Sequence, residues 1–113
     1  MLYGYKGKLL HIDLSKESST TIELPEEVLK KYIGGRGLGA KLYWDMVLPG
    51  TDALGPENML MVLSGPVSGT AVPGSGKHLI VTKSPVTGGW WSLVRSKVGS
   101  SGLCLSELTL NLR

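Results

Sequence analysis

Apolar and polar residues alternate along residues 8–14, a two-residue period that predicts a strand with one buried side. Residues 20–24 form a second run, rich in β-branched side chains, and a polar turn at residues 15–18 lies between the two. We therefore expect residues 8–24 to form an antiparallel hairpin.

After Pro25 the apolar positions change to a helical period. Two acidic residues follow the proline, as at the start of a helix, and the apolar spacing continues to Ile33. Gly34 and Gly35 then predict the end of this first helix. A second helix is expected from Leu38 to Met46.

Two further strands are predicted in the second half of the chain. The continuous apolar run at residues 59–63 favours a strand covered on both faces, and residues 77–83 alternate. Trp90 and Trp91 then point to opposite sides of an extended segment, one toward the core and one toward a ligand or partner. A hairpin, two helices and more strands in this order indicate an α+β fold, not a regular βαβ alternation.

Composition places the 113 residues in one globular domain, with 42% hydrophobic and 19% charged residues. Cys104 is the only cysteine, so the chain builds neither an internal disulfide nor a cysteine cluster. His11 and His78 lack metal-ligand spacing, and no stretch resembles a signal peptide or a membrane span. We therefore expect a cytoplasmic protein without membrane association.

The charges are distributed unevenly. Residues 1–57 carry seven Lys or Arg against eight Asp or Glu, whereas residues 58–113 carry five basic residues against Glu107 alone. The C-terminal half should favour an anion. A nucleic acid is not the expected partner, because the chain has neither a long basic run nor a nucleic-acid-binding motif.

Residues 64–76 form a loop in which eight of thirteen residues are Gly, Ser or Thr, and Lys77 follows directly. Glycines let backbone N–H groups approach an oxyanion, while hydroxyls and a lysine add donors. The spacing is not that of a Walker A loop, because Ala71 stands where its first glycine is required. A plain strand-to-strand connection explains the composition equally well.

The segment Gly35-x-Gly37-x-x-Ala40 satisfies the dinucleotide-binding pattern at the start of a helix. That pattern requires a preceding strand, and a helix is predicted there instead. A glycine-rich bend between two packed helices is the favoured interpretation, in which Arg36 remains able to serve an acidic partner.

Several dispersed motifs in one register resemble the N-terminal domain of the aldehyde ferredoxin oxidoreductases, across residues 1–91. The motifs are Tyr3-Gly4, Gly7-Lys8-Leu9-Leu10-His11-Ile12-Asp13-Leu14, Gly34-Gly35-Arg36-Gly37-Leu38-Gly39, Leu54-Gly55-Pro56-Glu57-Asn58, Ser64-Gly65-Pro66-Val67-Ser68-Gly69-Thr70 and Thr82-Lys83-Ser84-Pro85-Val86-Thr87-Gly88.

This resemblance implies a β-rich α+β domain with antiparallel or mixed sheets and two short helices, on which a tungsten or molybdenum bis-pterin cofactor rests. The implied enzyme oxidises aldehydes to carboxylic acids and passes electrons through a [4Fe–4S] cluster to ferredoxin, with the cluster ligands in later domains or another subunit. In the family, a basic residue at the end of the glycine-rich loop holds the pterin phosphates. Lys77 occupies that position, preceded by Gly74, Ser75 and Gly76.

The resemblance changes after Trp91. An asparagine expected near Val94 is missing, so we expect residues 92–113 to be a reading-frame artefact or the divergent end of a truncated gene. Leucines 103, 105, 108, 110 and 112 would then leave an exposed apolar tail.

The leading interpretation is thus a cofactor-binding fragment that is inactive alone. A stand-alone module is the alternative. It would bind a phosphorylated small molecule through residues 64–77, or form a homo-oligomer through Trp90, Trp91 and the tail. A nucleotide-binding domain built on residues 35–40 is the third.

Overall fold

The computed structural model of the chain describes residues 4–68, 70–96 and 108–111. Two strands, two helices and four further strands follow one another along the chain, and together they give the predicted α+β class. In chain order the elements are β1 (Lys8–Asp13), β2 (Ser18–Glu23), α1 (Glu26–Tyr32), α2 (Gly35–Met46), β3 (Leu60–Ser64), β4 (Lys77–Lys83), β5 (Trp90–Ser96) and β6 (Leu108–Asn111).

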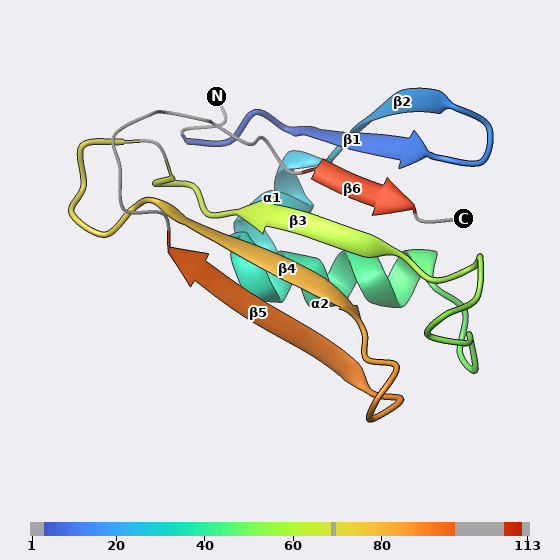
Figure 1. Cartoon of the computed structure of the whole chain (residues 1–113). Coiled ribbons are helices and arrows are strands. Elements are labelled where there is room, and N and C mark those ends of the chain that lie inside the picture. Colours follow the sequence, from blue (N-terminus) through green and yellow to red (C-terminus); the bar gives the residue numbers. More distant parts are fainter. Residues whose placement is uncertain (1–3, 69, 97–107, 112–113) are drawn as a thin grey trace.

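The strands form one sheet in the order β2-β1-β6-β3-β4-β5. The predicted hairpin is confirmed, with Lys8 opposite Glu23 and Asp13 opposite Ser18 in antiparallel register. The last strand in sequence, β6, lies inside the sheet, where it pairs parallel with β1 and antiparallel with β3 (Figure 1).

This insertion corrects one expectation about the leucine-rich end. Residues 108–111 are not a free apolar tail, because their backbone is hydrogen-bonded between two strands of the sheet. Leu103, Leu105 and Leu112, which were expected to share that tail, lie outside the described residues. The sequence missed the strand because its partner, β1, lies about a hundred residues earlier in the chain.

Both helices lie on the same face of the sheet (Figure 1). The core fills the space between them, and its most buried side chains are Leu9, Leu29, Leu38, Met61, Leu63 and Val81. The expectation that residues 59–63 are covered on both faces is only half right. Within β3, Met61 and Leu63 are buried, whereas Leu60 and Val62 on the opposite face remain partly accessible.

The second helix begins three residues earlier than predicted. Gly34 and Gly35 have φ values of 125° and 53°, so they make the bend, and α2 starts at Gly35. Such positive φ values favour glycine. The pattern missed the first turn because glycines have a low helix propensity, which packing overrides here.

Gly39 shows what that packing requires. A Cβ atom built on it would lie 2.7 Å from Leu63 Cδ1 and 2.9 Å from Val81 Cγ2. The backbone of α2 therefore rests directly on β3 and β4. Neither helix of the described chain, at 7 and 12 residues, has the length and apolarity of a membrane span.

We expect Gly39→Leu to lower the free energy of unfolding by about 3 kcal/mol, because the added side chain must displace α2 from the sheet. Ala40→Leu, one residue along the same helix at an exposed position, should change it by less than about 0.5 kcal/mol. Urea unfolding of both variants measures the difference. Equal stability of the two variants would contradict the close contact.

Candidate functional site

A cleft of about 400 Å³ opens where the start of α2 meets the 64–76 loop and the start of β4. We call it the basic cleft, because three of its lining residues are Arg36, Lys77 and His78. The other described residues that line it are Gly35, Leu63, Ser64, Gly65, Val67, Ser68, Gly74, Ser75, Leu79 and Val94. None of these described lining residues is a carboxylate, so the cleft carries a net positive charge.

Most of the hydroxyl groups in the 64–76 loop hold the loop together. Ser68 Oγ accepts a hydrogen bond from the Gly65 N–H at 3.1 Å and donates to the Lys77 carbonyl at 3.2 Å. Thr70 and Ser75 donate to the carbonyls of Val67 and Thr70, at 2.6 and 2.9 Å. The expectation that these hydroxyls point their protons at an anion is therefore wrong for all three. The cationic side chains are the stronger donors left to the cleft.

The structure brings together three of the four residues that the sequence nominated. Gly74, Ser75 and Lys77 line the basic cleft, while Gly76 connects them without lining it. Gly74 has a φ of 78°, so the turn before Lys77 needs a glycine there. Lys77 is exposed at the first position of β4. Arg36, outside the predicted set, lines the same cleft.

The bend before α2 lies against the beginning of the loop. A Cβ atom on Gly34 would lie 3.4 Å from Pro66 Cδ and from the Ser64 carbonyl oxygen, and one on Gly4 would lie 2.4 Å from the Pro66 oxygen. Three separate stretches of backbone thus meet at Pro66. The dinucleotide pattern at residues 35–40 lacks the strand that it requires, because α1 precedes it, and the bend interpretation fits.

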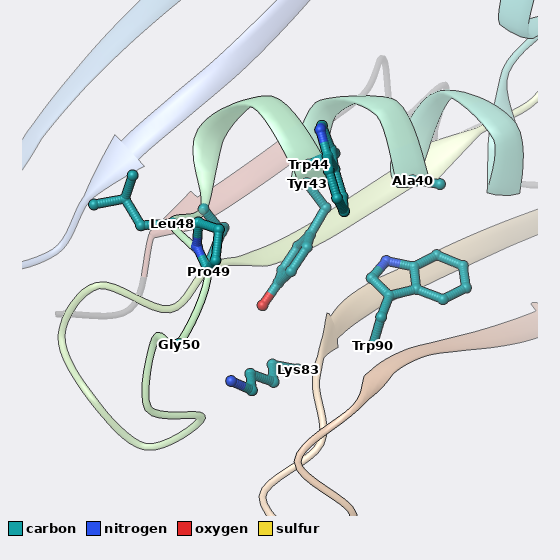
Figure 2. A pocket seen from close by; sticks show the side chains of 9 residues that line it. Ala40, Tyr43, Trp44, Leu48, Pro49, Gly50, Lys83 and Trp90 are labelled. Atoms are coloured by element: carbon teal, nitrogen blue, oxygen red, sulfur yellow. The ribbon is translucent and has the colours of Figure 1, made fainter.

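A second cavity, of about 330 Å³, lies at the other end of α2. We call it the aromatic pocket. Figure 2 shows Tyr43 and Trp44 on α2, Trp90 at the start of β5, and Lys83 below them. Trp44 is 82% exposed, and Trp90 and Trp91 are 42% and 45% exposed, so neither tryptophan of the predicted pair is a core residue. The sequence signal for this pocket was Trp44, an aromatic residue outside the apolar face of its helix.

Two residues that line the aromatic pocket, Tyr43 and Lys83, also bind the neighbouring loop at residues 51–58 through hydrogen bonds. Tyr43 donates from its hydroxyl to Asn58 Oδ1 at 2.7 Å, and Asn58, 8% exposed, donates to the Ala53 carbonyl and to Thr82 Oγ1. The Lys83 ammonium donates to the Thr51 carbonyl in the same loop. These bonds attach the loop at residues 51–58 to α2 and β4.

No group of three or more His, Cys, Asp or Glu side chains within the described ranges is arranged to hold a metal ion. Cys104 lies outside those ranges. The cleft that the described residues form is suited to an anion rather than to a cation.

Residues 9–105 match the family model described as the N-terminal domain of aldehyde ferredoxin oxidoreductase. The chain belongs to this family. The match extends beyond residue 91, and a domain boundary at that residue remains a prediction.

Two relatives and one solved structure illustrate the relationship. The chain is 46% identical, over 99% of its length, to the WOR-like subunit of an aliphatic sulfonate oxidoreductase from Pyrococcus furiosus. It is 42% identical, over 77% of its length, to a tungsten-containing aldehyde ferredoxin oxidoreductase from Thermococcus kodakarensis. It superposes on a chain of the BamBC active-site complex of benzoyl coenzyme A reductase, in complex with 1,5-dienoyl-CoA, with a TM-score of 0.90 and 27% identity over 98% of its length.

All three are much longer proteins. The chain spans 17% and 14% of the two relatives and 18% of the solved chain. It therefore corresponds to one domain of a larger family enzyme.

We expect Tyr43→Phe to lower the free energy of unfolding by about 1 kcal/mol at pH 8, because Asn58 loses its donor. Burial raises the pKa of Tyr43 above its usual value of 10.0. The folded state thus holds this proton more tightly than the unfolded state does. The protonated Tyr43 hydroxyl therefore stabilises the folded state fully below pH 10, and this stabilisation is lost as the pH rises through the raised pKa.

The difference between wild type and Tyr43→Phe should accordingly shrink between pH 8 and pH 11, as followed by urea unfolding. Tyr32→Phe is the matched control, since the Tyr32 hydroxyl makes no hydrogen bond to another described residue. A difference that stays constant with pH would contradict the assignment.

Proposed function

We propose that this domain holds a phosphate group of a tungsten- or molybdenum-pterin cofactor in the basic cleft, with Lys77 as its principal ligand and Gly74, Ser75 and Gly76 shaping the approach. The complete enzyme would oxidise aldehydes to carboxylic acids with ferredoxin as electron acceptor. The observation that carries the proposal is an open cleft with two cationic side chains, Arg36 and Lys77, and no carboxylate among its described lining residues. Tungsten relatives of the same family support the cofactor.

The donor set fits a phosphate group. A phosphate monoester carries about −1.5 to −2 charges at pH 7 and accepts hydrogen bonds through three oxygens. Lys77 offers a positive charge that no described carboxylate neutralises. The turn at Gly74, which lacks a side chain, lets the loop backbone come close to a bound phosphate. When bound, the cofactor would supply the redox chemistry, while this domain's residues bind and orient it.

Electron transfer would depend on residues outside this domain. The [4Fe–4S] cluster and its cysteines would lie in the other domains or a partner subunit, so that this chain alone would not turn over. We place the enzyme in the cytoplasm. A nucleic acid is a poor candidate ligand, because the chain has neither a long basic run nor a nucleic-acid-binding motif.

An aliphatic sulfonate is a second candidate substrate, because a relative 46% identical to this chain is named for that activity. A stand-alone phosphate-binding or self-associating module, without redox activity, is the competing function. It would use the same cleft without retaining a metal.

Metal analysis separates these functions. We expect tungsten or molybdenum to be retained when the chain is co-expressed with a polypeptide carrying the rest of the family enzyme. Lys77→Ala should lower metal content and weaken inorganic phosphate binding about 10- to 100-fold, the loss expected for a charge-assisted hydrogen bond. Inductively coupled plasma mass spectrometry and calorimetry are the measurements.

The control is Lys31→Ala, which removes one exposed charge outside the basic cleft. Phosphate binding without metal in the co-expressed complex would favour the stand-alone module. Unchanged phosphate affinity in Lys77→Ala would remove the proposed site.

A further inference from the structure

We propose that Arg36 is a second ligand of the same phosphate group, so that Lys77 and Arg36 bind the anion from two different elements. This inference rests on the proposed function. It adds a residue of α2 to a site that the sequence placed only in the 64–77 segment.

The first support is position. Arg36 is the second residue of α2, and it lines the basic cleft together with Lys77 at the start of β4. The two residues are 41 positions apart in sequence. Only the packing of α2 against β3 and β4 brings them to one cavity.

The second support is that Arg36 is exposed and has no hydrogen bond or ion pair with any residue that the structure describes. Two of the other three helical cations are ion-paired, whereas Lys31 only lies over the Tyr32 ring. Lys30 pairs with Glu26 at 2.7 Å, and Lys41 pairs with Asp45 at 2.8 Å. The residue four positions after Arg36 within α2 is Ala40, which offers no carboxylate.

The third support is the fixed backbone on both sides of Arg36. A Cβ atom on Gly34 would lie 3.4 Å from Pro66 Cδ and from the Ser64 carbonyl oxygen, and Gly39 packs against Leu63 and Val81, so the backbone on both sides of Arg36 is held close to β3 and β4. A fixed backbone leaves fewer conformations to be restricted on binding, which lowers the entropy cost.

The chemistry of the pair suits a dianion. Lys77 supplies a compact charge, and the planar guanidinium of Arg36 can hold two oxygens of one phosphate group. Two positive charges in a cleft without a described carboxylate match the charge of a phosphate monoester.

The test measures binding of inorganic phosphate and of phenyl phosphate to the purified chain by calorimetry and by ³¹P NMR. We expect Arg36→Ala to raise the dissociation constant at least about tenfold for both probes. Arg36→Lys should recover only part of this loss, because it restores the charge without the two-pronged geometry. Lys31→Ala, which removes an equal charge outside the cleft, should bind like wild type.

The outcomes separate the two proposals. If Lys77→Ala weakens binding and Arg36→Ala does not, the cleft holds phosphate without Arg36, and this inference fails alone. If neither variant weakens binding, both proposals fail. If Arg36→Lys binds as weakly as Arg36→Ala while the thermal unfolding midpoint of both is unchanged, the guanidinium itself is required, which supports the inference. A loss in Lys31→Ala as large as in Arg36→Ala would mean a general charge effect and would overturn it.

Discussion

The contact between α2 and the sheet at Gly39 determines where every candidate site lies. A missing side chain there lets the helix backbone reach Leu63 and Val81, and the same helix then has its first turn beside the 64–76 loop and its last turns beside β4 and β5. The basic cleft and the aromatic pocket are therefore the two ends of one packing arrangement. A larger residue at position 39 would move both, because α2 behaves as a single rigid element.

Within the basic cleft, the loop's own polar groups and the groups open to a ligand have separate roles. The hydroxyls of Ser68, Thr70 and Ser75 donate to backbone carbonyls of the loop and of Lys77. That leaves the formal charges of Lys77 and Arg36 available. A loop held by neutral hydrogen bonds keeps its shape whether or not an anion is present, while the charged side chains supply the stronger, ligand-dependent interactions.

Local patterns were sufficient to predict the hairpin, α1 and β4, because their hydrophobic period and flanking residues agree with the final structure. They could not predict α2's first turn, where tertiary packing overrides glycine's propensity, nor β6, whose partners are distant in sequence. For the site, three of the four nominated residues, Gly74, Ser75 and Lys77, line the basic cleft, and their role in binding a cofactor stays a prediction. Residue types could not show that the hydroxyls of Ser68, Thr70 and Ser75 donate to backbone carbonyls, or that Arg36 lines the same cleft, because both depend on the fold.

The lack of an intrahelical partner for Arg36 has a physical consequence beyond local stability. An acidic residue at position 40, four residues after Arg36 within α2, would add about 0.3–0.5 kcal/mol to the helix, as a surface ion pair does. It would also compensate the charge of Arg36, which lines a cleft without a described carboxylate. Such an ion pair would compete with an incoming dianion for the guanidinium of Arg36. Arg36, without an ion pair to a described residue, lies on a helix whose other cation, Lys41, is paired with Asp45, and it therefore keeps its charge available to an anion.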